Sequence, residues 1–377
     1  MSFQAQLSPT RVVFGEGVSS QLAKEAQSLG IRTVLLLMDP FMATTPTGVA
    51  LHAMLQESGA TVVLSTDVEP DPTAGRIESI AQIARQSGVD GIVAIGGGSA
   101  IDTAKAVGVL CFHQADAIAP FYFGGSQTPK GMLPLIAIPT TAGTGSEVTF
   151  VSIVTEPTTQ RKLLVRHVTL APDVALVDPL LCATMPTSLT VATGMDALAH
   201  ALEAITSTVA SPLSDALALQ AIPMVLNALP ALVRDGHNPN HRAAMSQAAT
   251  MAGMAFLSGR VHLGHAVGHA LGGAYHLPHG SACMVMMPQI MQFIAQAQPQ
   301  RIQPVAQVFG CTVADVPHII QDFMQTCGAP RLYALVSSHA PTHDDLVALI
   351  EGEDRLIGLS PVRPTKADWV HMIESAW

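Results

Sequence analysis

The sequence predicts an α/β N-terminal domain built on a parallel sheet, followed by an all-α C-terminal domain. In the first half, short apolar runs alternate with stretches of helical periodicity, which is typical of βαβ units. Beyond residue 185, long Ala-, Leu- and Met-rich stretches with few β-branched runs indicate helices. A chain of 377 residues has room for two domains of ~150 residues or more. We therefore expect an α/β domain over residues 1–185 and a helical domain over residues 186–377.

The strands of the α/β domain are expected where short apolar runs end in turn residues. Such runs begin at Thr33, Thr61, Gly91, Leu133 and Val174. Continuous apolar runs of this length are typical of parallel strands that are buried on both faces. Helical spacing separates the first four runs, over residues 48–58, 73–87 and 99–111. This alternation predicts a parallel sheet with crossover helices.

Composition excludes two classes of partner. The net charge is -10, with 18 Lys and Arg against 28 Asp and Glu. The chain therefore lacks the basic surface that binds nucleic acid or anionic lipid. Its apolar runs are interrupted before the ~20 residues that a membrane helix needs, so we expect no membrane partner. With 49% hydrophobic residues and mean hydropathy of +0.38, we expect a large core and a subunit interface.

The N-terminus and the cysteines favour a cytoplasmic protein. The opening MSFQAQLSPTRVVF has no charged segment followed by an apolar stretch and no small-residue cleavage site. The five cysteines are odd in number, scattered, and never in a C-x-x-C arrangement. We interpret them as reduced core thiols.

A glycine-rich turn, Gly96-Gly97-Gly98-Ser99, follows a predicted strand and opens a predicted helix. Backbone N–H groups at a helix N-terminus favour an anion, so this turn is a candidate phosphate site. The G-x-G-x-x-G fingerprint is absent because Ile101 replaces its last glycine. The alternative is structural, since Ser99 and Asp102 also fit an S-x-x-D capping pattern.

A second polar loop, PTTAGTGSE over residues 139–147, follows the next strand. Its hydroxyl groups are suited to phosphate, ribose or the nicotinamide amide, although a turn can also use them for its own backbone. Two such loops at the carboxyl ends of strands in one α/β domain point to the crevice where these sheets bind nucleotides.

Five of the fifteen histidines crowd into one short stretch of the second half. They are His262, His265, His269, His276 and His279. Upstream, Asp196 and His200 are spaced i, i+4 on one helical face, which Glu203 shares. A carboxylate with several imidazoles suits Zn²⁺ or Fe²⁺. Spacing alone does not choose the ligands, and the alternative for the Asp196 helix is a polar stripe on an amphipathic surface.

Seven motifs in order along the chain resemble the iron-containing (group III) alcohol dehydrogenase family. They are RVVFGEGV, VEPDPT, GGGSAIDTAK, PTTAGTGSE, TGMDALAHALEA, HAVGHALGGAYHLPHG and the terminal ESAW. Lactaldehyde reductases and propanediol oxidoreductases are among the members that look similar. The resemblance implies a dehydroquinate synthase-like fold, NAD as cofactor, and a divalent metal, with Fe²⁺ expected and Zn²⁺ as the alternative.

The resemblance also assigns residues by motif. It implies that the metal ligands are Asp196, His200, His265 and His279. It implies that the cofactor contacts are Asp39, Asp71, Gly97, Gly98, Ser99, Asp102, Thr140, Thr141, Thr144 and Lys162. His269 would lie beside the nicotinamide and substrate as the catalytic residue. The sequence departs from the family at Ile205, where Tyr is frequent, and at His262, which has no family role.

Together these features predict a metal-dependent, NAD(H)-linked alcohol dehydrogenase or aldehyde reductase acting on a small primary alcohol or aldehyde. We expect a cytoplasmic homodimer or higher homo-oligomer. A dehydroquinate synthase-like lyase shares the fold but needs a cationic pocket for a phosphorylated acid, which the low Lys and Arg count opposes. A non-catalytic metal or nucleotide sensor would not need both the complete set of metal ligands and the complete set of cofactor contacts.

Overall fold

The structure, a computed structural model, describes residues 3–158 and 161–377 and divides them into two compact units. The sheet unit contains Ser8–Thr141 and Gly145–Ala183. The helical unit contains Thr184–Trp377, a short N-terminal segment that ends at Leu7, and Ala142–Thr144. The sequence did not indicate that these two short segments group with the helices. The nucleotide- and metal-binding roles expected of the two domains stay predictions.

The sheet unit contains a six-stranded parallel sheet in the order β1-β8-β5-β4-β2-β3. Its strands are β1 (Arg11–Phe14), β2 (Thr33–Met38), β3 (Thr61–Ser65), β4 (Gly91–Gly96), β5 (Leu135–Pro139) and β8 (Val174–Val177). The predicted parallel α/β fold is confirmed. Strand β1, only four residues long, was missed. Strand β3 was expected to be buried but is largely accessible, because it forms one edge of the sheet.

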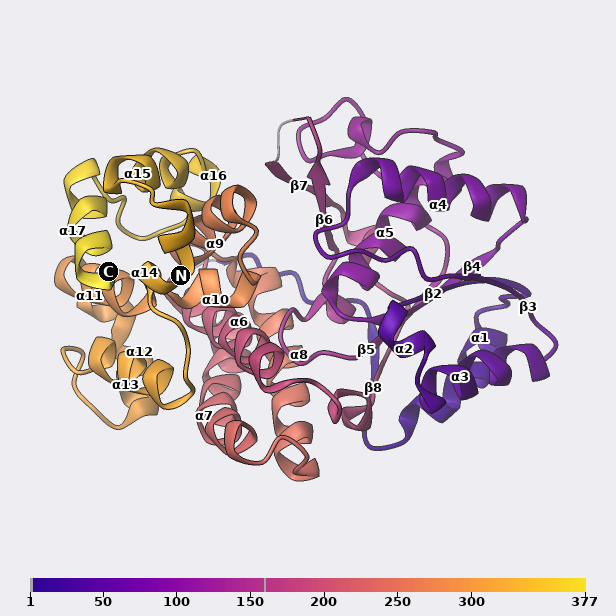
Figure 1. The fold of residues 1–377 in the computed structure, drawn as a ribbon, viewed down its shortest axis with the longest axis horizontal. Coiled ribbons are helices and arrows are strands. Elements are labelled where there is room, and N and C mark those ends of the chain that lie inside the picture. The colour runs from indigo at the N-terminus through magenta and orange to yellow at the C-terminus, as the bar shows by residue number, and fades with distance from the viewer. Residues whose placement is uncertain (1–2, 159–160) are drawn as a thin grey trace. The chain divides into compact units, whose positions relative to one another are not determined.

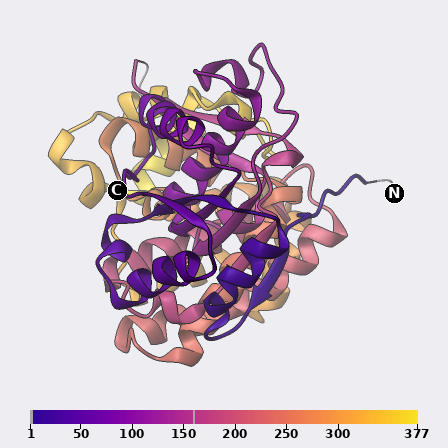
Figure 2. The ribbon, with the colours of Figure 1, turned by 90° about the vertical axis from the view of Figure 1, so that its right-hand side faces the viewer.

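Helices cover both faces of this sheet (Figure 1; the same unit faces the viewer in Figure 2). They are α1 (Leu22–Ser28), α2 (Pro40–Ala43), α3 (Pro46–Glu57), α4 (Ala74–Gln86) and α5 (Gly98–His113), with 3-10 turns at Val18–Gln21, Ala119–Phe121, Ser146–Val148, Val168–Leu170 and Pro179–Cys182. Alternate residues of β2, such as Val34 and Leu36, pack with Leu22 and Leu55 of α1 and α3. Helix α5 packs on the opposite face beside Ile92 of β4. This two-sided burial explains the continuous apolar runs of the central strands.

An antiparallel hairpin of β6 (Val151–Glu156) and β7 (Arg161–Arg166) interrupts the alternation of strands and helices. The sequence analysis missed it because its strands mix charged and apolar residues and carry no turn signal of their own. The hairpin is anchored beside α5, where the Ser152 hydroxyl donates to the backbone oxygen of Asp102 (2.8 Å).

The strand order brings loops together at the carboxyl ends of neighbouring strands, which we call the sheet edge below. From β2 the chain moves outward to β3 and then returns to the other side of β2 for β4. In open α/β sheets, ligands bind at the carboxyl ends of the strands where the order reverses in this way. Asp39 follows β2, and its N–H donates to the carbonyl oxygen of Ile95 in β4 (2.9 Å). Thr140, after β5, donates to the carbonyl oxygen of Gly96 (3.0 Å).

The helical unit is built around α6, whose side chains are almost all buried from Thr190 to Thr206. Its small residues allow close packing: a Cβ on Gly194 would lie 2.7 Å from a methyl group of Leu229 in α7. The predicted helical C-terminal part is confirmed. Its helices are α6 (Thr187–Thr206), α7 (Pro212–Arg234), α8 (Pro239–Gly259), α9 (Leu263–Tyr275), α10 (His279–Met284), α11 (Met287–Ala297), α12 (Pro299–Phe309), α13 (Val316–Thr326), α14 (Leu332–Val336), α15 (His343–Glu351), α16 (Asp354–Ile357) and α17 (Lys366–Ala376), with a 3-10 turn at Ser337–His339.

Helix α7 is long and apolar enough, by length and composition, to cross a membrane. Its apolar run is nevertheless interrupted by Asp215, Pro223 and Pro230, as the sequence analysis expected. The signal is weak, because a helix in a packed bundle passes the same test. Helix α7 contains Pro223 and Pro230 and packs along α6 and α8 within the helical unit. The absence of a membrane partner stays a prediction.

Candidate metal centre and nucleotide-binding edge

One carboxylate oxygen, Oδ1 of Asp196, lies at the centre of a group of imidazoles. The Nε2 atoms of His200, His265 and His279 lie 3.8, 3.7 and 3.8 Å from it. Ligand atoms bound at about 2.0–2.2 Å around a tetrahedral ion are about 3.3–3.6 Å apart. Each of these three distances is close to the separation expected between two donors on a single divalent ion.

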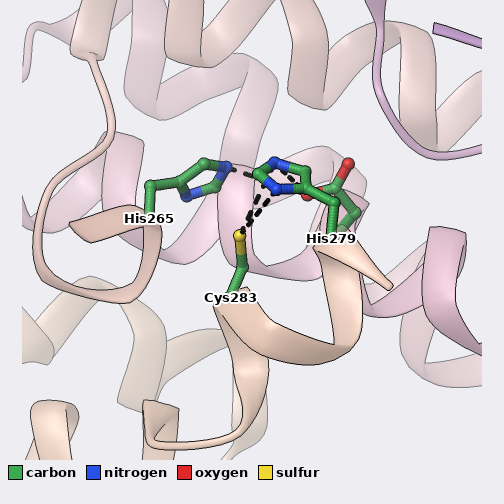
Figure 3. Close-up of side chains that lie close together, drawn as sticks. His265, His279 and Cys283 are labelled. Carbon is green, nitrogen blue, oxygen red and sulfur yellow. Dashed lines mark hydrogen bonds and ion pairs between the residues drawn. The ribbon is translucent and has the colours of Figure 1, made fainter. Parts of the chain in front are cut away.

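Three helices of the helical unit bring these donors together. Asp196 and His200 lie one turn apart on α6, His265 lies on α9, and His279 begins α10. Helix α10 approaches α6 closely because residue 280 is glycine: a Cβ there would lie 2.7 Å from the Cβ of Asp196. Figure 3 shows the rings of His265 and His279 directed toward one another. A catalytic metal site keeps one side open for substrate, and His279 is the most accessible of the four side chains at 32%.

The burial of the imidazoles indicates that the donors fit a metal. Nε2 of His265 is buried and lies 3.7 Å from Oδ1 of Asp196. Burial alone would lower the pKa of this ring, but Cys283 and Glu203 raise it well above its usual value. A buried polar nitrogen needs a partner, and a bound metal would be one. Burial holds the pKa of His200 well below its usual range, so this ring is neutral. Neutral imidazole is the form that binds metals.

Glu203, whose role the sequence left open, orients a ligand. Its Oε1 accepts from the backbone N–H groups of His262 (3.0 Å) and Gly264 (2.7 Å), and its Oε2 contacts Nδ1 of His265. Burial alone would raise the pKa of Glu203, but His265, His262 and these N–H groups lower it, so the carboxylate stays charged. A carboxylate on Nδ1 directs Nε2 toward a metal and raises the basicity of the ring.

His262 has a structural role in this arrangement. Its ring is fully buried, with Nε2 2.8 Å from the hydroxyl oxygen of Thr206 and Nδ1 3.5 Å from Oε1 of Glu203. These contacts fix the end of α6 to the start of α9. His262 is therefore engaged away from the four candidate ligands.

His269 lies one turn beyond His265 on α9, at the border of the donor group. Its ring centroid is 5.7 Å from that of His279, and its Nδ1 lies 3.8 Å from Oε2 of Glu353. The sequence analysis missed Glu353, which lies far along the chain from every motif. A carboxylate behind the ring stabilises a protonated imidazole, which suits a group that handles a proton.

At the sheet edge, the N-terminus of α5 has no side-chain cap. Its N-cap residue is Gly97, which excludes the structural alternative of a cap formed by Ser99 and Asp102. Asp102 instead accepts from the Ser146 hydroxyl and from the N–H of Ile153 (2.9 Å), and thereby binds the start of α5 to the hairpin. An uncapped helix start retains N–H groups for an anion.

Other predicted cofactor residues surround this helix start. The hydroxyl group of Thr141 lies beside Gly97, and Gly98 and Ser99 form the first turn of α5. Asp39 caps α2, since its Oδ1 accepts from the N–H of Phe41 (2.9 Å). Asp71 and Lys162 form an ion pair (2.6 Å) in the sheet unit, whereas Thr144 groups with the helical unit. The cofactor roles of all these residues stay predictions.

Comparisons with known proteins identify relatives along nearly the whole chain. The profile of the iron-containing alcohol dehydrogenases matches residues 9–179, and that of the C-terminal region of the Fe-containing alcohol dehydrogenase family matches residues 190–377. A long-chain-alcohol dehydrogenase of Geobacillus thermodenitrificans is 33% identical over 98% of each chain. An NAD-dependent methanol dehydrogenase of Bacillus methanolicus is 35% identical over 81% of this chain and 80% of its own. The crystal structure of sulfoacetaldehyde reductase from Bifidobacterium kashiwanohense in complex with NAD⁺ matches with a TM-score of 0.92 and 30% identity, covering 100% of this chain and 99% of that one.

The contact between Glu203 and His265 predicts a loss of metal affinity in Glu203→Gln. This variant keeps the shape of the side chain but removes the charge that orients His265. We expect Zn²⁺ affinity to fall about 10- to 100-fold, measured by competition with a chromophoric chelator. Glu374→Gln, on the exposed face of α17, is the control. Equal affinities in the two variants would contradict the orienting role.

Proposed function

The chain belongs to the iron-containing alcohol dehydrogenase family, and on that premise we propose that it transfers hydride between NAD(H) and a small primary alcohol or aldehyde. The observation that carries this proposal is the approach of three imidazole nitrogens to Oδ1 of Asp196. We propose that Asp196, His200, His265 and His279 hold one divalent metal.

The chemistry divides between bound groups and side chains. A divalent metal would act as a Lewis acid toward the alcohol or aldehyde oxygen, and NAD supplies or accepts the hydride. Asp196 contributes the negative charge that balances the cation. Glu203 holds His265 in the orientation that metal binding requires. His269, with Glu353 behind it, would give or take the proton that accompanies hydride transfer.

The sheet edge supports NAD binding. The uncapped start of α5 suits the diphosphate, and Asp39 stands at the end of the neighbouring strand. A carboxylate in this position can accept a hydrogen bond from the 2′-hydroxyl of the adenosine ribose and repels the 2′-phosphate of NADP. We therefore propose that Asp39 makes the protein prefer NAD.

We further propose Fe²⁺ as the metal, with Zn²⁺ as the alternative, and a cytoplasmic homodimer or higher homo-oligomer. The mixed carboxylate and imidazole donors suit either ion. The high hydrophobic content, 49% of residues, supports a subunit interface.

A turnover assay tests the proposed function. Anaerobically purified protein is depleted of metal with a chelator, reloaded with Fe²⁺ or Zn²⁺, and followed by NADH oxidation with a panel of small aldehydes. We expect turnover that is lost on depletion and restored on reloading. Undiminished turnover after complete depletion, or no NADH oxidation with any aldehyde after reloading, would contradict the proposal.

Substitution of Asp39 tests the cofactor preference. Asp39→Asn keeps an oxygen to cap α2 but removes the charge, and Asp39→Gly removes both. Both variants should lower the NAD-to-NADP ratio of kcat/KM, by about tenfold or more, because repulsion of the 2′-phosphate is lost. A ratio unchanged from wild type in both variants would show that Asp39 does not read the ribose.

Substitution of His269 tests proton transfer. His269→Ala should retain metal and NADH but lower kcat by about 10²- to 10⁴-fold, the usual loss when general acid–base help is removed. Metal content, NADH affinity and kcat are measured on one preparation, with the exposed His318→Ala as control. Loss of the metal would instead make His269 a ligand, and unchanged kcat would make it a packing residue.

A further inference from the structure

Cys283 places a sulfur atom in the metal centre, where the sequence analysis expected only a core thiol. All five cysteines lie in the described part of the chain and none forms a disulfide. Cys283 lies on α10 one turn after His279, and its Sγ is 3.6 Å from Nε2 of that histidine. Figure 3 shows the sulfur directed toward the His279 ring. The i, i+4 spacing of His279 and Cys283 was the sequence signal for this arrangement.

The donor atoms of this region form two overlapping sets. Asp196, His265, His279 and Cys283 each offer one atom, and these four atoms all lie within 4.8 Å of one another. This set differs from the expected ligand set only in containing Cys283 in place of His200. Nε2 of His265 is buried, lies 3.7 Å from Oδ1 of Asp196, and points into the same space.

Packing holds the sulfur in this position. Residue 268 on α9 is glycine, and a Cβ there would collide with the Cys283 sulfur. The Cys283 side chain is fully buried, so its sulfur has little freedom to turn toward solvent. The absent side chain at position 268 thus leaves the space that the sulfur fills at the border of the donor group.

We propose that Cys283 is a direct sulfur ligand of the divalent metal in this protein, added to or exchanging with the Asp and His ligands. The inference rests on the metal site of the proposed function. On binding, the S–H bond breaks, the sulfur keeps the electron pair and donates it to the cation, and the proton leaves to water.

A thiolate changes which metal the site prefers. Thiolate is a softer ligand than carboxylate or imidazole and favours Zn²⁺ over Fe²⁺ relative to a site with only oxygen and nitrogen donors. Burial raises the pKa of the Cys283 thiol, so in the metal-free chain the sulfur is protonated. Metal binding through sulfur therefore releases a proton and weakens as pH falls.

Cobalt substitution tests the proposal without relying on activity. Metal-depleted wild-type protein, Cys283→Ser and Cys327→Ser are each loaded with Co²⁺, and the near-ultraviolet absorption and bound Co²⁺ are measured. Cys327 is the matched control, because it is also buried and lies in the helical unit outside the donor group. We expect a thiolate-to-Co²⁺ charge-transfer band in the wild type and in Cys327→Ser, and its complete loss in Cys283→Ser.

The other outcomes are decisive as well. One Co²⁺ per chain without the band in the wild type overturns the sulfur ligand and leaves the proposed function intact. A band that persists in Cys283→Ser also overturns it, and a wild-type chain that binds no Co²⁺ overturns the metal site itself. If Cys283→Ser fails to fold, X-ray absorption of wild-type protein loaded with Zn²⁺ decides: sulfur at about 2.3 Å supports the proposal, and only lighter ligands at about 2.0–2.2 Å overturn it.

Discussion

The buried carboxylate of Asp196 is the constraint on which the helical unit depends. It lies on α6, whose side chains are almost all buried from Thr190 to Thr206, and a second, fully buried carboxylate, that of Glu203, lies two turns further along. Buried charges are costly unless they are paired. Glu203 is paired by backbone N–H groups and by His265, and imidazole nitrogens surround Oδ1 of Asp196 at ligand spacing. The proposed divalent cation would supply positive charge at this point.

Close packing of the helices brings the donors together. Gly280 lets α10 approach α6, and Gly268 lets α9 and α10 approach one another, so that donors from three helices meet. The same close approach brings the Cys283 sulfur among the donors. In the sheet unit, the reversal of strand order places Asp39 and the uncapped start of α5 at one edge. The residues proposed for the metal and for the cofactor are thus each gathered by the local geometry of one unit.

Sequence reasoning predicted the features that have a local signal. Apolar runs located β2, β4, β5 and β8, and helical spacing placed Asp196 beside His200. It could not find Glu353, whose contact with His269 joins distant segments, and it missed the antiparallel hairpin, whose strands mix charged and apolar residues. The capping alternative that it weighed for Ser99 and Asp102 is excluded, because the Asp102 oxygens accept from the loop and the hairpin. It expected Cys283 to be a reduced core thiol, and the residue is buried and outside any disulfide; its approach to His279 depends on the packing of α10, which the sequence did not indicate.

The metal content of the purified protein tests the central claim most directly. Elemental analysis is applied to anaerobically purified wild type, His279→Ala and the exposed control His318→Ala. His279 is the most accessible of the four candidate ligands, so its removal disturbs the packing least. The account predicts one divalent metal per chain in the wild type and control, and a clear loss in His279→Ala. Full occupancy in His279→Ala would contradict it.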